Sequence, residues 1–558
     1  RGIVQLVFDS EKQADIYKQA QTLRSEFVID VTGIAEARSD DTINPNLPTG
    51  KLEINVQALT ILNRAETPPF MISEKDMFGN ENADAHYVDE DIRISYRYLD
   101  LRRSSMQQNF VKRSKMIKAM RDYLDSQEFL DVETPVLTKS TPEGARDYLV
   151  PSRTHENKFF ALPQSPQLFK QLLMVSGFDR YYQVVKCFRD EDLRPNRQPE
   201  FTQLDLEASF IDETFIYDLI EGLMVDVAAV CDIKLPTPFP RLTYDEAMNR
   251  YGSDAPDLRF DMPLCDVTDI LPDSGYKIFN TIVKNGGLIK GMRIPGQAAA
   301  LSKNVLQNEF AMSLIQKMGG KGMTWMKLEN GEFLSNIVQF FTQDELNQIK
   351  DRLSAEDGDV LVFVADTDHH LVNTVLGKFR VFIADRQGLI PENTYAPCWV
   401  TNFPLFDPHE SGVTSTHHPF TQPDGPLPER LDQASLLDVK SRAYDVVLNG
   451  EEVGGGSIRI HDPEVQSQIF DILGLTDADI EQKFGFFINA LKYGAPPHGG
   501  LALGVDRLVS ILLGVDSIRE VIAFPKNRVA YCPLTQAPST VDDKQLSELN
   551  LKSIPSLV

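Results

Sequence analysis

Short apolar runs separated by turn residues mark the first 66 residues of the chain. Residues 3–8, 27–31 and 52–56 are such runs, and Asn-Pro and Pro-Thr-Gly lie between the last two. Strands bounded by turns give this pattern, so residues 1–66 are predicted to form a small β-rich module. The periodicity fades over residues 67–105, which predicts a hinge or linker.

A helical spacing follows the linker. Between Met106 and Gln127 apolar residues recur at near-helical intervals, and residues 129–135 then read as a strand that ends in proline. This helix and strand open a larger domain, whose first part is predicted over residues 106–259.

Residues 260–394 contain strand and helix patterns but little polar pocket chemistry, although both flanking regions are rich in polar motifs. We interpret this stretch as an inserted α+β domain. The larger domain then resumes over residues 395–536, and residues 537–558 are predicted to be a loosely ordered tail. The chemistry is therefore expected within about residues 130–210 and 395–530.

Length and composition narrow the class of protein. A chain of 558 residues exceeds what one hydrophobic core supports, so about three or four domains are expected. No apolar run approaches the roughly 18 residues of a membrane helix, which predicts no membrane partner. The five cysteines form no Cys-x-x-Cys pair, so a reducing cytoplasm fits best. The chain begins at Arg1 without a leader, and we expect a truncated N-terminus.

The net charge of −25 argues against general affinity for nucleic acid, because binding to a polyanion depends on Lys and Arg. One stretch differs: between Arg93 and Arg121 there are nine Lys or Arg and a single acid, Asp100. It is a candidate phosphate-facing surface. A solvated hinge and helix face would explain the same charges equally well.

Residues 181–210 read as a strand, a charged loop and a second strand. In the second strand Gln203, Asp205 and Glu207 alternate with apolar residues, so a period of two places these polar side chains on one face. A solvated sheet face would give the same alternation. The motifs on either side favour a polar pocket instead.

A second informative segment, Pro497–Arg507, is a glycine-rich apolar strand that turns into a helix with Arg507 in its first turn. Arginine beside the free N–H groups of a helix start suits phosphate oxygens. A Walker A loop is excluded because no Gly-Lys-Ser/Thr follows Gly504, and a dinucleotide fingerprint does not fit at Gly454–Ser457. A nucleotide site here would be of another kind.

These segments resemble a known family. Residues 188–207 are similar to motif 2 of the class II aminoacyl-tRNA synthetases, residues 500–507 to motif 3, and the helix and strand ending at Pro135 to motif 1. Within that class, the chain resembles the bacterial or organellar aspartyl-tRNA synthetases at residues 96–102, 141–146, 164–170, 417–418 and 454–461.

The resemblance implies a multidomain α+β fold. It comprises an N-terminal OB-fold β-barrel that binds the anticodon, an antiparallel-sheet catalytic core flanked by helices, and the inserted domain. Residues 1–8 are similar to a strand midway through the OB-fold, so we expect its first strands, with their anticodon contacts, to be missing. Motif 1 implies a homodimer.

The activity implied is attack of aspartate on ATP, with Mg²⁺, followed by transfer of the aspartyl group to tRNA(Asp). The resemblance gives each site residue a role. Arg189 and Arg507 are the catalytic cations, and Asp445 and Glu452 hold Mg²⁺. The aspartate site is expected to comprise Glu143, Gln167, Lys170, Arg189, Asp205, His417, His418 and Arg459. The ATP site is expected to comprise Arg189, Asp190, Glu191, Gln198, Glu452, Gly504, Val505, Asp506 and Arg507.

Charge explains the choice of amino acid. Arg459, with Lys170 beside it, can bind the side-chain carboxylate of aspartate, whereas a neutral amide would leave these cations partly unpaired. Glu143 would bind the ammonium group. Each residue also has a plainer reading, since a single strand arginine is often a surface ion pair and His417-His418 before a proline can be a simple turn.

Three alternatives remain. A synthetase of relaxed specificity would also aspartylate tRNA(Asn). A tRNA-independent, AMP-forming asparagine synthetase would use the same catalytic core, but the basic hinge and the β-module argue against it. A non-catalytic RNA-binding relative would be expected to lack the phosphate arginines, and Arg189 and Arg507 are both present.

Overall fold

The computed structural model describes residues 3–74, 82, 87–141, 145–410 and 412–552. The chain divides into two compact units. The first comprises residues 1–113, 193–198 and 519–541, and the second comprises residues 114–192, 199–518 and 542–558. Among the described residues, no helix combines the length and the apolar character that crossing a bilayer requires.

The first unit begins with a three-stranded sheet in the order β1-β3-β2. The apolar runs of the N-terminal sequence fall on these strands, with β1 parallel and β2 antiparallel to β3. Gly33 lies at a bulge of β2, where an added Cβ would fall 2.4 Å from the Asn55 carbonyl oxygen, so no larger residue fits without a shift. The elements are β1 (Gln5–Val7), α1 (Ala14–Ala20), β2 (Val28–Ala37), η1 (Asp40–Thr42) and β3 (Leu52–Asn63).

Two short helices, α3 (Glu90–Ser95) and α4 (Arg97–Asp100), follow in this unit, and the long helix α5 (Ser104–Ser126) continues into the second. Asp89 caps α3 by accepting a hydrogen bond from the Asp91 N–H. The basic stretch does not all face solvent, because Arg97 and Arg103 are only 2% and 5% exposed. As a phosphate-facing surface it is therefore smaller than its charge count suggests.

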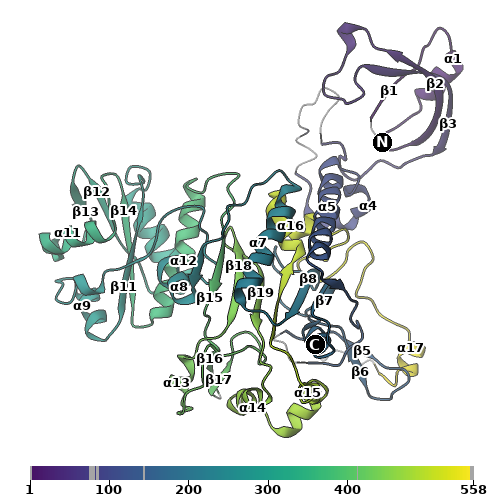
Figure 1. The fold of residues 1–558 in the computed structure, drawn as a ribbon. Coiled ribbons are helices and arrows are strands. Elements are labelled where there is room, and N and C mark those ends of the chain that lie inside the picture. The colour runs from purple at the N-terminus through teal and green to yellow at the C-terminus, as the bar shows by residue number, and fades with distance from the viewer. Residues whose placement is uncertain (1–2, 75–81, 83–86, 142–144, 411, 553–558) are drawn as a thin grey trace. The chain divides into compact units, whose positions relative to one another are not determined.

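The second unit is built on an eight-stranded sheet (Figure 1). Its middle strands are antiparallel, and only the outer pairs β4–β7 and β9–β15 are parallel. In spatial order the strands are β4 (Leu130–Asp131), β7 (Arg180–Phe188), β8 (Glu200–Ser209), β20 (His498–Gly504), β19 (Glu451–Ile458), β18 (Ala443–Leu448), β15 (Pro397–Thr401) and β9 (Arg241–Thr243).

Helices cover this sheet, and their ends follow local sequence rules. Thr243 and Glu246 form a capping box at the start of α8, and α16 ends at Gly514 in a left-handed conformation. The helices of the second unit are α6 (Gln167–Val175), α7 (Glu213–Ala229), α8 (Tyr244–Tyr251), α13 (Gln433–Leu437), α14 (Pro463–Ile472), α15 (Asp477–Leu491), α16 (Val505–Leu513) and α17 (Asp543–Glu548), and η5 (Ile518–Glu520) begins in this unit and ends in the first. Two small hairpins are β5 (Leu149–Pro151) with β6 (Phe159–Ala161), and β16 (Phe406–His409) with β17 (Gly412–Ser415).

Between β9 and β15 the chain forms a separate five-stranded sheet in the order β10-β11-β14-β12-β13. Its central strand β14 is almost continuously apolar because hydrophobic clusters cover both faces of the sheet. The strands are β10 (Cys265–Asp266), β11 (Leu288–Ile294), β12 (Thr324–Glu329), β13 (Glu332–Leu334) and β14 (Val360–Asp366). The helices are η2 (Thr268–Ile270), α9 (Lys277–Lys284), η3 (Val305–Leu314), α10 (Ile315–Lys317), η4 (Val338–Phe340), α11 (Gln343–Arg352) and α12 (His369–Arg386).

Candidate active site

A polar cavity of about 290 Å³ lies over the middle of the eight-stranded sheet, against α6. It brings together residues that are far apart in the sequence. Nine of the predicted site residues line it: Gln167, Lys170, Arg189, Asp205, His417, His418, Asp445, Glu452 and Arg459.

Two cations and two carboxylates form a buried cluster at this cavity. The Lys170 Nζ lies 2.8 Å from Asp205 Oδ1 and 3.3 Å from Glu207 Oε2. On the other side, the Arg459 Nε donates to Glu207 Oε1 at 2.9 Å. Burial opposes ionisation of Glu207, but Arg459 and Lys170 outweigh it and lower the pKa of this carboxyl. Glu207 is thus the shared counter-ion of both cations.

Glu207 was not among the predicted site residues. The available signal was its place on the same strand face as Gln203 and Asp205. Alternation indicates which face a side chain occupies, but it does not identify the cations of other elements that lie opposite.

Some buried polar atoms of the cavity are still available. Asp205 Oδ2 and Gln167 Nε2 have no hydrogen-bond partner among the described residues, although both residues are under 9% exposed. An unsatisfied buried polar atom costs free energy, so such atoms at a cavity wall indicate a ligand or ordered water. The carboxylate oxygen would accept from a ligand, and the amide would donate to one.

Arg459 is also fixed from its other end. Its Nη1 donates to Ser457 Oγ at 2.7 Å and to the His418 ring Nε2 at 2.9 Å. Burial and the charge of Arg459 lower the pKa of His418 well below its usual range, and they lower that of His417 to about 4. Both imidazoles are therefore neutral at neutral pH, and the positive charge of the cavity comes from Arg459, Lys170 and Arg189.

Asp445 and Glu452 lie on the paired strands β18 and β19. Burial, then Glu452 and Asp254, raise the pKa of Asp445 well above its usual range. The close approach of the strands depends on glycine, because a Cβ added at Gly455 would fall 2.4 Å from Asp445 Oδ1. No group of three or more His, Cys, Asp or Glu suited to a metal occurs in the described part of the chain.

Of the two arginines predicted to bind phosphate, Arg189 lines the cavity, and Arg507 lies at the start of α16. Arg189 lines the cavity with its guanidinium 5.2 Å from the centre of the Phe201 ring. Arg507, in the first turn of α16, donates to the Glu452 carbonyl oxygen, and its Nε lies 3.9 Å from Glu451 Oε2.

The remaining predicted ATP residues stay predictions. Asp506 accepts from the Thr202 N–H at 2.7 Å and so ties α16 to β8, Val505 is fully buried, and Gly504 is the N-cap residue of α16. The Asp190 N–H donates to the Arg146 carbonyl oxygen at 3.0 Å. In the first unit, Gln198 pairs with the backbone of Lys526. Glu191 lies on the loop between β7 and β8, and Glu143 lies outside the described residues.

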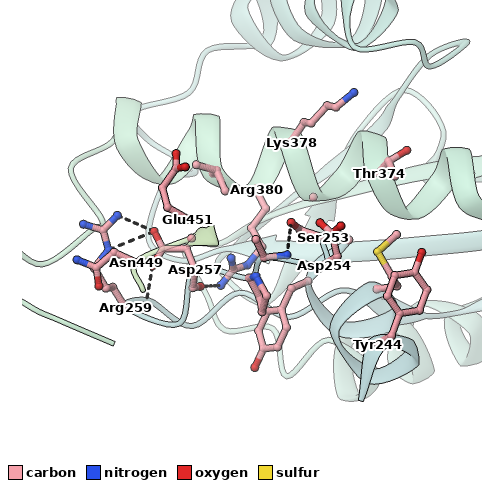
Figure 2. Close-up of a pocket in the computed structure, with 18 of the residues that line it drawn as sticks. Tyr244, Ser253, Asp254, Asp257, Arg259, Thr374, Lys378, Arg380, Asn449 and Glu451 are labelled. Carbon is pink, nitrogen blue, oxygen red and sulfur yellow. Dashed lines mark hydrogen bonds and ion pairs between the residues drawn. The ribbon is translucent and has the colours of Figure 1, made fainter. Parts of the chain in front are cut away.

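A second cavity is larger, at about 650 Å³, and lies between α8, α12 and the β18–β19 turn (Figure 2). Its most prominent charges already have protein partners. Arg259 forms a two-pronged pair with Asp257, with Nη2 2.7 Å from Oδ2. The buried Arg380 donates to three carbonyl oxygens, those of Asp257, Phe260 and Met262. None of the predicted site residues lines this cavity.

Comparison with known proteins identifies the family of the chain. Residues 89–528 match the model of the family "tRNA synthetases class II (D, K and N)". The aspartate–tRNA(Asp/Asn) ligase 1 of Syntrophus aciditrophicus is 56% identical over 99% of this chain and 77% of that protein. The aspartate–tRNA ligase of Staphylococcus saprophyticus is 47% identical over 99% of this chain and 92% of that protein.

A solved structure supports the fold. The asparaginyl-tRNA synthetase of Pyrococcus horikoshii, complexed with asparaginyl-adenylate, has a TM-score of 0.54 at 18% identity, and the match covers 94% of this chain and 88% of that one. At that identity the likeness concerns the fold alone, which is that of a class II tRNA synthetase. Together, the identities over 99% of this chain and the matching family model establish that the chain belongs to the class II tRNA synthetases, among the aspartate–tRNA ligases.

Proposed function

We propose that this chain activates L-aspartate with ATP and transfers the aspartyl group to the 3′ end of tRNA(Asp). The observation that carries the proposal is the buried cluster at the 290 Å³ cavity, where Arg459 and Lys170 face an open space beside the unpartnered Asp205 Oδ2. A ligand with a carboxylate and an ammonium group complements this wall in charge.

We assign recognition of aspartate to the cations Arg459 and Lys170 and to the acid Asp205. Arg459 binds the side-chain carboxylate with Lys170 beside it, and Glu207 keeps both cations in place. Asp205 and Gln167 orient the α-amino end, with Glu143 as a further partner of the ammonium group. Asparagine, which lacks the second negative charge, would leave the cations partly unpaired, and buried unpaired charge is costly.

Activation is attack of the aspartate α-carboxylate on the α-phosphorus of ATP, which forms aspartyl-adenylate and releases pyrophosphate. The terminal 3′-hydroxyl of tRNA then attacks the carbonyl carbon of the adenylate, and AMP leaves. Because negative charge develops on the phosphate, catalysis depends on positioned cations. We assign Arg189 to the α-phosphate and Arg507 to the γ-phosphate end, with Asp190, Glu191, Gln198 and residues 504–506 as further contacts.

Asp445 and Glu452 suit Mg²⁺. Burial, and then the neighbouring Glu452 carboxylate, raise the pKa of Asp445, and a hard cation would relieve the repulsion between the two carboxylates. The small number of protein ligands also fits, since Mg²⁺ is usually held by one or two carboxylates together with substrate phosphates. When bound, the ion would neutralise phosphate charge.

The finer architecture belongs to the same proposal. Residues 1–66 form the anticodon-binding OB-fold, residues 67–105 the hinge, and residues 260–394 the inserted domain. The catalytic core comprises residues 106–259 and 395–536, ahead of the tail at 537–558. We also propose a homodimer formed through motif 1.

Charging of two transcribed tRNAs tests the function. With labelled aspartate, ATP and Mg²⁺, tRNA(Asp) should be charged. The names of relatives such as that of Syntrophus aciditrophicus favour a second candidate, an enzyme that also charges tRNA(Asn). Charging of tRNA(Asp) alone supports the discriminating form, and charging of both supports the second candidate. Charging of neither, with aspartate-dependent pyrophosphate exchange intact, would indicate adenylate chemistry without tRNA.

A further inference from the structure

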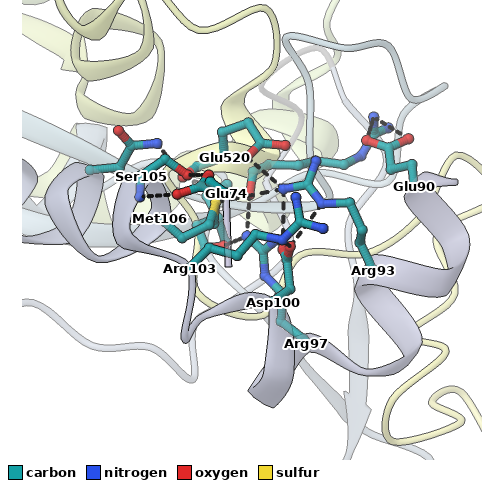
Figure 3. A network of polar contacts seen from close by, with 12 residues as sticks. Glu74, Glu90, Arg93, Arg97, Asp100, Arg103, Ser105, Met106 and Glu520 are labelled. Carbon is teal, nitrogen blue, oxygen red and sulfur yellow. Dashed lines mark hydrogen bonds and ion pairs between the residues drawn. The ribbon is translucent and has the colours of Figure 1, made fainter. Parts of the chain in front are cut away.

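A cluster of buried arginines surrounds Asp100 in the first unit (Figure 3). The Asp100 carboxylate is fully buried, and it accepts from Arg93 Nε at 2.8 Å and from Arg97 Nη1 at 2.5 Å. Arg103 Nε lies 3.3 Å away. Arg93 also pairs with Glu520, at 2.9 Å. Because three guanidinium groups share one carboxylate, each has N–H donors left for other partners.

Arg97 uses its remaining donors on the backbone of another segment. Its guanidinium donates to three carbonyl oxygens, those of Arg519 at 2.6 Å, Ile522 at 2.9 Å and Ala523 at 3.0 Å. Three carbonyl groups from five consecutive residues therefore converge on one planar fork. A lysine ammonium is a single point donor and cannot reproduce this grip.

The same segment holds the end of the motif 2 loop. The Gln198 side chain donates to the Lys526 carbonyl oxygen at 3.0 Å and accepts from the Lys526 N–H at 2.8 Å. Arg519 Nε donates to that carbonyl oxygen as well, at 3.2 Å. Gln198 is only 5% exposed and precedes the first residue of β8, Glu200, by two positions.

We infer that Arg97 is a positioning residue for ATP binding, which acts by fixing residues 519–526 and, through them, Gln198 and the motif 2 loop. The inference rests on the proposed function, in which that loop contacts ATP. Arg97 lies on α4, within the basic stretch predicted as a candidate phosphate-facing surface but outside the predicted aspartate and ATP sites. A purely structural arginine would instead stabilise the fold without favouring one substrate.

Steady-state kinetics of aspartate-dependent ATP–pyrophosphate exchange separate these roles. Arg97→Lys in the full chain keeps the charge beside Asp100 but loses the fork. We expect the KM for ATP to rise about tenfold, the factor equivalent to ~1.4 kcal/mol. The KM for aspartate should stay the same, and kcat should change by less than about twofold.

Arg352→Lys is the matched control. Arg352 also donates to a carboxylate and to a carbonyl oxygen, those of Asp269 and Asp266, but it lies on α11 of the five-stranded sheet. Neither KM should change in this variant. Arg519→Lys removes the hydrogen bond from Arg519 Nε to the Lys526 carbonyl oxygen and tests the same inference at a second residue. It should raise the KM for ATP about threefold.

A double variant tests the path. If Arg97 acts through Gln198, then Arg97→Lys should add little to the effect of Gln198→Ala on the KM for ATP. Additive effects, or equal increases in both KM values, would overturn the inference. If the KM for ATP is unchanged in both Arg97→Lys and Arg519→Lys while exchange by the parent chain is normal, the inference is wrong and the proposed function stands. Absence of aspartate-dependent exchange in the parent chain overturns the proposed function and the inference with it.

Discussion

The two cavities of the second unit differ in a way that volume does not predict. The larger one, at about 650 Å³, has walls whose arginines are already paired with Asp257 or with backbone carbonyl oxygens. The smaller one, at about 290 Å³, has Asp205 Oδ2 and Gln167 Nε2 without partners among the described residues. Unsatisfied buried polar atoms, rather than space, therefore identify the binding site.

The comparison has an energetic basis. A paired charge such as Arg259 with Asp257 has already recovered much of its desolvation cost, so a ligand gains little by replacing its partner. At the smaller cavity Arg459 and Lys170 are paired as well, with Glu207 and Asp205, and the difference lies in Asp205 Oδ2. This oxygen has no hydrogen-bond partner among the described residues, so a ligand group that donates to it gains a hydrogen bond without breaking one. Substitutions at the smaller cavity should consequently change activity far more than substitutions at the larger one.

Arg459→Leu should give the largest effect. It removes the cation assigned to the aspartate side chain, and we expect aspartate-dependent pyrophosphate exchange to fall about 10²- to 10⁴-fold, since losing one partner of a buried charge pair costs ~3–5 kcal/mol. ATP binding, measured by calorimetry, should persist and serves as the control for folding. Undiminished exchange in this variant would show that Arg459 does not bind aspartate and that the smaller cavity is not the amino-acid site.

Asp205→Asn should come next. It keeps the shape of the side chain but removes the negative charge of the unpartnered oxygen. Because a hydrogen bond to a charged group contributes ~1.5–3 kcal/mol, we expect the KM for aspartate to rise about 10- to 10²-fold. A rise confined to the KM for ATP would show that this oxygen does not face the amino acid.

Asp445→Asn should change the requirement for Mg²⁺. With one of its two carboxylate ligands made neutral, the ion is held less tightly, and the half-saturating Mg²⁺ concentration in exchange should rise about tenfold. Asp254→Asn is the matched control, because Asp254 lines the larger cavity although its charge acts on Asp445. An equal Mg²⁺ shift in both variants would contradict the assignment of Asp445 as a ligand.

Glu207 links the comparison to stability. Its folded pKa is lowered, so its stabilising effect is complete above its ordinary value of 4.5 and is lost as the pH falls through the folded value. Glu207→Gln should therefore lower the unfolding midpoint clearly at about pH 7, by the equivalent of ~3 kcal/mol, and less at about pH 4. A deficit that grows on acidification would have the wrong sign.

Lys378→Met should give the smallest effect. Lys378 lines the larger cavity and is exposed. Since that cavity has no assigned part in the reaction, exchange and charging should both stay within about twofold of the parent, as for most surface substitutions. A tenfold loss of charging with exchange intact would instead assign this cavity to the tRNA step.

Sequence reasoning reached the site residues by motif and charge, and the structure brings nine of them to one cavity. It did not find Glu207, because the alternation along β8 gives a face but not a partner across the sheet. It also treated Arg97 and Arg103 as solvated or phosphate-facing, whereas both are buried. Charge patterning counts cations, but burial depends on segments hundreds of residues away, such as Arg519–Ala523.

Helix α12 of the proposed inserted domain packs against the segment that follows α8, so the two parts of the chain depend on one another. Arg380 of α12 donates to the Asp257 carbonyl oxygen, and a Cβ added at Gly377 would fall 2.4 Å from the Gly252 carbonyl oxygen, so the helix is in close contact with the end of α8. A descendant that deleted the proposed insertion would lose this guanidinium and uncover α8 in one step. The domain would then be retained because α8 and the segment after it need its contacts, whatever function the domain first had.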